Sequence, residues 1–119
     1  MTSPRPGAER PEDLTRLFVE RVNAGDVEGL LDLYDPEAAM AFPPGQLTVG
    51  HDALRRLFEQ MVASRPAFGA EEPLTTLVVG DLALTATRAR DEAGARAQVA
   101  RRGADGTWRR VLDRPDFRS

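Results

Sequence analysis

The apolar residues of this chain change their spacing partway along it, and this change restricts the fold more than any other feature. Between residues 11 and 65 most of them recur every three or four positions, which is the period of an amphipathic helix. From residue 74 onward they alternate with polar residues, as they do in a strand. A chain that places helices before a run of strands favours an α+β fold, with the helices on one face of a sheet.

Three helices are predicted in the first part of the chain. The first begins at Pro11, which suits the first helical position, and ends at Gly25. The second is shorter and carries an apolar stripe that includes Tyr34. A short strand over 37–42 separates it from the third helix, whose apolar face lies within 54–61.

Four strands are predicted in the second part of the chain. They span 74–79, 82–90, 95–102 and 107–113. The Asp105-Gly106 pair between the last two strands is a strong hairpin signal. The prediction is therefore an α+β fold in which a curved antiparallel sheet packs against three N-terminal helices.

The length and charge of the chain narrow its class. Its 119 residues fit one domain, which we expect over 11–119 after a flexible lead-in of residues 1–10. A net charge of −3 argues against nucleic acid as a partner. No apolar run is long enough to span a membrane, and the first ten residues lack the apolar centre of a secretory signal. We expect a cytoplasmic protein with no membrane partner.

Residue types that are missing exclude several kinds of chemistry. The chain contains no cysteine, and all 16 basic residues are arginine, so thiol nucleophiles and Schiff-base lysines are excluded. His51 is the one histidine, which excludes a site built from several imidazoles. We therefore expect neither a metal site nor a cofactor.

The arginines are concentrated in the predicted sheet. Residues 1–84 carry seven arginines and 14 acidic residues, whereas residues 85–119 carry nine arginines and five acidic residues. Such a face is usually solvated or lies in a dimer contact. The alternative is a surface or pocket that prefers anionic groups.

Several short motifs give the chain a family resemblance. Asn23-Ala24-Gly25-Asp26 lies between two predicted helices, Val49-Gly50 leads into the third, and Gly106-Thr107-Trp108-Arg109 begins the last strand. In order and spacing these motifs resemble the SnoaL-like and ketosteroid-isomerase-like proteins of the nuclear transport factor 2-like superfamily. The resemblance implies a cone-shaped, cystatin-like fold, an apolar pocket that opens at one end, and a homodimer formed through the outer sheet face.

The resemblance also identifies chemistry that this chain lacks. The three catalytic positions of ketosteroid isomerase, a tyrosine, a base and a protonated aspartate, fall on Phe18, Phe42 and Gln98. Neither phenyl ring transfers a proton, and an amide has no acidic proton. Epoxide hydrolases of the limonene type use an Arg-x-Asp pair, whereas this chain has arginine at Arg96 but Gln98 in place of the carboxylate. The isomerase activity is excluded in that form, and the epoxide hydrolase activity is disfavoured, because Asp113 could supply one acid but could not serve as both base and proton donor.

Two residues remain as catalytic candidates, Asp113 as an acid or base and Tyr34 as a proton donor to a carbonyl oxygen. The alternatives are that Asp113 forms a salt bridge with Arg109, Arg114 or a neighbouring strand, and that Tyr34 is a core residue. His51 is expected near a helix cap, facing solvent.

The expected ligand pocket combines large apolar side chains with two polar ones from the sheet. Its residues are Leu14, Phe18, Tyr34, Met40, Phe42, Phe58, Met61, Arg96, Gln98 and Trp108. If Gln98 points inward, alternation predicts that Arg96 does too, and a buried arginine needs an acidic partner or an anionic ligand. The same alternation places Trp108, Arg110 and Leu112 on one face of the last strand, with Asp113 on the other.

We therefore predict a protein that binds a small apolar or anionic organic ligand. The alternative is an enzyme of natural-product metabolism, such as a polyketide cyclase, with a single acid/base residue. Small residues at Ala83, Thr85, Thr87 and Ala89 on one face of a strand favour the homodimer contact.

Overall fold

The computed structural model describes residues 7–64, 72–88 and 96–115, which form three helices and a six-stranded sheet. The helices are α1 (Asp13–Asn23), α2 (Val27–Leu31) and α3 (His51–Ala63). The strands are β1 (Tyr34–Met40), β2 (Thr48–Val49), β3 (Leu77–Val79), β4 (Leu82–Thr87), β5 (Arg96–Arg102) and β6 (Trp108–Arg114). The predicted α+β class and the order of the elements are confirmed.

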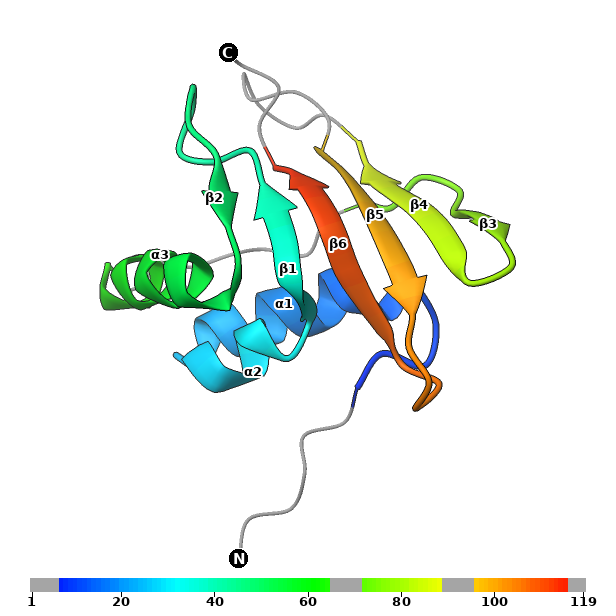
Figure 1. The fold of residues 1–119 in the computed structure, drawn as a ribbon, viewed down its shortest axis with the longest axis horizontal. Coiled ribbons are helices and arrows are strands. Elements are labelled where there is room, and N and C mark those ends of the chain that lie inside the picture. The colour runs from blue at the N-terminus through cyan, green and yellow to red at the C-terminus, as the bar shows by residue number, and fades with distance from the viewer. Residues whose placement is uncertain (1–6, 65–71, 89–95, 116–119) are drawn as a thin grey trace, which may run out of the picture.

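The sheet has the strand order β2-β1-β6-β5-β4-β3 and is curved (Figure 1). Neighbouring strands are antiparallel, except that β1 runs parallel to β6. In the view of Figure 1, α1 passes behind the sheet, α2 lies below the lower end of β1, and α3 lies beside β2. The antiparallel sheet predicted from the sequence did not include the parallel β1–β6 pairing, because that pairing joins segments about 75 residues apart.

Local signals define the helices. Gly25 adopts a φ of +71° directly after α1, a conformation that residues with a side chain rarely accept. The Asp26 carboxylate then accepts a hydrogen bond of 3.0 Å from the Gly29 amide and caps α2. Gly50, with a φ of +86°, precedes α3. These turns place the apolar stripes of all three helices toward the sheet.

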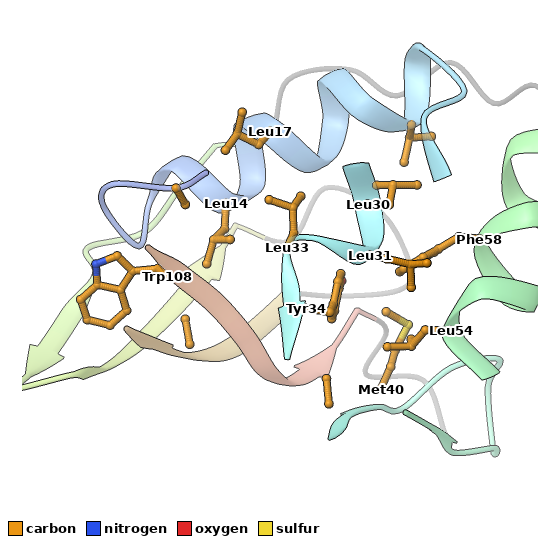
Figure 2. Close-up of a cluster of buried hydrophobic side chains, with 14 of the residues drawn as sticks. Leu14, Leu17, Leu30, Leu31, Leu33, Tyr34, Met40, Leu54, Phe58 and Trp108 are labelled. Atoms are coloured by element: carbon orange, nitrogen blue, oxygen red, sulfur yellow. The ribbon is translucent and has the colours of Figure 1, made fainter. Parts of the chain in front are cut away.

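The core fills the space between the helices and the inner face of the sheet (Figure 2). Leu14, Leu30, Leu54 and Phe58 have no exposed surface. In Figure 2, Phe58, Leu31, Leu54 and Met40 lie together at one end, and Trp108 lies at the other. Each fully buried aliphatic or aromatic side chain of this kind stabilises the fold by roughly 1.5–3 kcal/mol.

Tyr34 does not belong to the second helix, as its spacing had indicated, but is the first residue of β1. The helix ends at Leu31, and the Arg110 amide of β6 donates a hydrogen bond of 2.8 Å to the Leu33 carbonyl. Pairing with a distant strand therefore overrides the helical period at this point.

The inner face of β4 is formed by its small residues. Ala83, Thr85 and Thr87 are buried against the interior, whereas Leu82 and Leu84 are exposed on the outer face. The use of these three small residues as evidence for an outer dimer contact was therefore wrong, and Ala89 lies outside the described residues. Alternation along a strand shows which residues share a face, but it does not show which of the two faces is buried.

The segment before α1 contacts the sheet from residue 7 onward. Ala8 is buried, and its carbonyl accepts a hydrogen bond of 2.9 Å from the Trp108 amide. Residues 1–6 of the expected lead-in lie outside the described residues.

Candidate functional site

Three buried polar side chains meet on the inner face of the sheet, where β1 and β6 lie side by side. The Tyr34 hydroxyl donates a hydrogen bond of 2.5 Å to Asp113 Oδ2. Arg110 Nη1 donates to the Tyr34 hydroxyl oxygen at 3.2 Å and lies 3.7 Å from Asp113 Oδ2. Tyr34 is 1% exposed, Arg110 is 3% exposed and Asp113 is 6% exposed. We call Tyr34, Arg110 and Asp113 the polar cluster.

A β-bulge in β6 brings Arg110 and Asp113 to the same face. Ala100 of β5 pairs with Arg110, and the next residue back, Val99, pairs with Leu112, so that Val111 is an extra residue in β6. In a regular strand, residues three apart point to opposite faces. The predicted alternation was therefore wrong from Val111 onward: Asp113 is buried inside, and Leu112 is 54% exposed on the outer face.

The first helix holds Arg110 in place. Arg110 Nη2 donates a hydrogen bond of 3.2 Å to the Thr15 hydroxyl of α1. The Phe18 ring from the same helix lies 5.3 Å from the guanidinium carbon, and the Tyr34 ring lies 5.8 Å from it. Both distances suit cation–π interactions, which are stronger when the cation is desolvated. Arg110 thus balances the charge of Asp113 within the core.

Burial and charge set the protonation of Tyr34. Removal from water raises the pKa of its hydroxyl well above the ordinary value of 10.0, and the negative charge of Asp113 raises it further. Arg110 opposes this shift but does not cancel it. Tyr34 therefore remains a hydrogen-bond donor at neutral pH and fixes one carboxylate oxygen of Asp113.

The second carboxylate oxygen is different. Asp113 Oδ1 is buried and has no hydrogen-bond partner among the described residues, and the same holds for Thr87 Oγ1. Asp113 pairs across the strands with Gln98, which in turn pairs with Thr85. Thr85, Gln98 and Asp113 all lie on the inner face, so they form a strip of buried polar groups across β4, β5 and β6.

The structure brings together most of the predicted site residues. Tyr34 and Asp113, predicted as separate catalytic candidates, are bonded to each other, and Gln98 points inward beside them. The Phe58 ring lies 6.2 Å from the Phe18 ring and 5.4 Å from the Tyr34 ring, measured between centroids. The arginine that pairs with Asp113 is Arg110. The alternative drawn from the sequence had named Arg109 or Arg114.

Other predicted residues are placed around or away from the cluster. Leu14, Met40 and Trp108 are buried in the core, and Phe42 and Met61 are partly buried against it. Arg96 is half-buried, and its Nε donates a hydrogen bond of 3.1 Å to the Pro115 carbonyl. His51 is half-buried, with Nε2 2.8 Å from the Tyr34 carbonyl oxygen, so it positions β1 instead of facing solvent.

Sequence reasoning missed Arg110, Thr15 and Thr85 as parts of the site. Their only signal was an Arg-x-x-Asp spacing in the last strand, which alternation assigns to opposite faces. The bulge that changes this assignment leaves no clear mark in the sequence.

The outer face of the sheet carries a shallow groove of about 380 Å³. Its lining includes Ala39, Leu47, Leu84, Val99 and Leu112. Several of the sheet's arginines pair at exposed sites with acids, including Arg101 with Asp35, Arg102 with Asp81 and Arg109 with Asp105.

Neither a metal site nor a membrane span is found in the part of the chain that the structure describes. Its histidine and acidic residues form no group of three that would hold a metal ion. None of its helices is long and apolar enough to cross a membrane.

The sequence and the fold were compared with those of known proteins. One relative, the epoxide hydrolase LasB of Streptomyces lasalocidi, is 45% identical over 53 residues, which are 44% of this chain and 19% of that protein. The chain thus matches about a fifth of the length of this relative.

Two solved structures share the fold. One is named as a calcium/calmodulin-dependent protein kinase type II association domain of Thiobacillus denitrificans, with a TM-score of 0.74, 19% identity and coverage of 93% of this chain and 98% of that one. An NTF2-like protein with a cystatin-like fold from Novosphingobium aromaticivorans has a TM-score of 0.64 and 23% identity, over 87% and 78% of the two chains. At these identities the likeness shows the fold alone. A family model described as the SnoaL-like domain matches residues 15–113, and the chain therefore belongs to the SnoaL-like family within the NTF2-like superfamily.

Proposed function

We propose that this protein binds a small, largely apolar organic molecule against the inner face of its sheet, with Asp113 Oδ1 accepting a hydrogen bond from the molecule. The observation that carries the proposal is the buried, unpaired state of this oxygen among the described residues. A buried acceptor without a donor costs about 1–3 kcal/mol, and more for a charged group. A ligand hydroxyl or N–H group would recover this free energy.

The surroundings of the polar cluster favour an apolar ligand body. Phe18 and Phe58 lie next to Tyr34, and Met40 pairs with Asp113 across β1 and β6. Apolar sites with a few fixed polar groups are typical of small-molecule pockets. The polar groups give orientation, and the apolar ones give most of the affinity.

Between the two ligand classes predicted from the sequence, the cluster favours the neutral one. Arg110 already lies beside Asp113 and donates to Tyr34 and Thr15. An anionic group next to Asp113 would meet a second negative charge in a medium of low dielectric constant. We therefore expect a neutral ligand that carries a hydrogen-bond donor.

Asp113→Asn tests this proposal. The Tyr34 hydroxyl needs an acceptor and the Arg110 guanidinium lies beside it, so the new amide turns its oxygen toward them and presents its NH2 group where Oδ1 was. A library of neutral apolar compounds, screened by thermal shift, should contain hydrogen-bond donors that stabilise the natural protein and lose this effect in the variant. Asp81→Asn, at an exposed carboxylate bonded to Arg102, is the matched control. Donor compounds that stabilise all three proteins equally would refute the role of Asp113.

Acid/base catalysis is a second candidate, favoured by the open lone pairs of Asp113 Oδ1 and by the match to an epoxide hydrolase. Asp113 would take a proton from a hydroxyl or from a carbon next to a carbonyl group, and return it later in the reaction. Tyr34 is a poor acid because its pKa is raised, so reactions that use one group in turn suit the site best. Turnover of styrene oxide or of 2,6-heptanedione, lost in Asp113→Asn, would support catalysis; no turnover in either protein would leave binding as the function.

We also propose that the chain forms a homodimer through the outer face of the sheet. Leu47, Leu84 and Leu112 are 68%, 42% and 54% exposed there and lie along the groove. Exposed apolar surface of this kind is typical of a contact with another protein. The cytoplasmic location expected from the sequence stays a prediction.

A further inference from the structure

The polar strip contains a second polar group, the Gln98 side-chain amide, that has no role in the binding proposed above. Gln98 is 5% exposed, and its Oε1 accepts a hydrogen bond of 2.9 Å from the Thr85 hydroxyl. Its Nε2 amide does not donate to Asp113 Oδ1, because that oxygen is unpaired among the described residues. A donor and an acceptor thus lie buried on neighbouring strands without bonding each other.

The register of the sheet aligns these groups. Thr85 pairs with Gln98, and Gln98 pairs with Asp113, so the three residues form one row across β4, β5 and β6. Side chains at paired positions lie about 4.5–5.5 Å apart at their Cβ atoms on the same face of the sheet. One ligand group can therefore reach both Gln98 and Asp113.

The direction of the Gln98 amide follows from its two neighbours. The Thr85 hydroxyl can either donate or accept, and by itself it permits both orientations of the amide. The Asp113 carboxylate can only accept. If the amide turned around, its Oε1 would face Asp113 Oδ1 and two acceptors would oppose each other. The NH2 group therefore faces the same side as Asp113, and Thr85 donates to the oxygen.

We propose that Gln98 and Asp113 form a donor–acceptor pair that selects a carbonyl group with an adjacent N–H or O–H group, as in a primary amide or a lactam. Gln98 Nε2 donates to the carbonyl oxygen, and Asp113 Oδ1 accepts from the adjacent N–H or O–H. Thr85 is a positioning residue, because it acts through the orientation of Gln98. This inference rests on the proposed binding function and adds the chemical class of the ligand group.

Three probes of nearly equal shape separate the contributions. α-Methylstyrene carries no strong hydrogen-bonding group, acetophenone adds the carbonyl oxygen, and benzamide adds an NH2 group in place of the methyl. We expect acetophenone to bind about fivefold more tightly than α-methylstyrene, and benzamide about tenfold more tightly than acetophenone, from the usual strengths of neutral and charge-assisted hydrogen bonds.

Nuclear magnetic resonance gives both the affinities and a direct reporter. The chain has only four side-chain amides, Asn23, Gln46, Gln60 and Gln98, so the Gln98 NH2 signals are assigned by their loss in Gln98→Met. Acetophenone and benzamide should shift these signals in the natural protein, and α-methylstyrene should not shift them comparably.

The variants test each half of the pair. Gln98→Met should abolish the advantage of acetophenone over α-methylstyrene, and Asp113→Asn should abolish that of benzamide over acetophenone. Thr85→Val, which also serves if Gln98→Met does not fold, should move the Gln98 signals and reduce the carbonyl advantage. Thr87→Val removes a buried hydroxyl from the same face of the same strand and is the control, with both ratios kept.

The outcomes separate this inference from the binding function. Equal affinity for all three probes would refute the donor–acceptor pair but keep an apolar binding site. An equal loss of the acetophenone advantage in Thr85→Val and Thr87→Val would refute the role of the Thr85–Gln98–Asp113 row. Binding of none of the probes would contradict the binding function and this inference with it.

Discussion

The stability of this protein above pH 9 should depend on Tyr34 almost alone. Tyr34 is the one tyrosine, and the chain has no lysine or cysteine, the other side chains that titrate between pH 8 and 11. In the folded protein, burial and the charge of Asp113 raise the pKa of Tyr34 well above 10.0. In the unfolded chain it ionises near 10.

The sign and size of the effect follow from these two states. Below pH 10 both states hold the phenolic proton, and the stabilisation is complete. Above pH 10 the unfolded chain loses the proton and the folded protein keeps it, so the free energy of unfolding falls by about 1.4 kcal/mol per pH unit. At pH 11 the loss is about 1.4 kcal/mol relative to pH 9.

Urea unfolding followed by circular dichroism at pH 8–11 measures this slope, and absorbance at 295 nm reports the phenolate of the single tyrosine. The absorbance should rise only as the protein unfolds. Tyr34→Phe is the control: its stability should be nearly constant over this range, although lower at neutral pH by about 1.5–3 kcal/mol because Asp113 loses a charge-assisted hydrogen bond. Ionisation near pH 10 in the folded protein, or the same slope in Tyr34→Phe, would refute the reasoning.

Three further predictions concern other parts of the molecule. Hydrogen bonds from Thr107, and then the guanidinium of Arg109, lower the pKa of Asp105 to about 2. The contribution of this carboxylate to stability is therefore present above pH 4 and disappears as the pH falls through 2. A carbon-detected titration should find this carboxyl still largely ionised at pH 3. Leu84→Arg places a charge on the outer face and should convert a dimer to a 13.0 kDa monomer in sedimentation, whereas a natural protein that sediments only as 13.0 kDa would contradict the dimer. Deletion of Val111 removes the bulge but leaves Asp113 two residues after Arg110, so regular alternation should keep Asp113 on the inner face beside Tyr34; Tyr34→Phe should then still destabilise the deletion variant by about 1.5–3 kcal/mol in urea unfolding, and no further loss would show that Asp113 had left Tyr34.

The fold was predictable because its signals are local. The apolar face of α3, the Gly25 turn and the Asp105-Gly106 hairpin each depend on a few adjacent residues. The parallel pairing of β1 with β6 was not predictable, because no short segment encodes it. This pairing also moved Tyr34 from the expected helix into the sheet.

The candidate site was predictable in its members but not in its connections. Asp113 and Tyr34 were identified by their chemistry, and Gln98 was expected to point inward. The bond between Asp113 and Tyr34 and the role of Arg110 depend on the register of β6 at a single residue. Period-2 reasoning assigns Arg110 and Asp113 to opposite faces, so the structure was needed to join them.

The extra residue in β6 also has a consequence for how such a site tolerates sequence change. Up to Arg110 the inward-facing residues occupy one set of alternate positions, and after Val111 they occupy the other set. The bulge therefore shifts the inward–outward alternation of β6 by one residue. A substitution that straightened the bulge, with no residue gained or lost, would turn Leu112 inward and Asp113 outward in a single step. A polar interior and an apolar outer surface would change together, which couples the chemistry of the pocket to the surface through which two copies would meet.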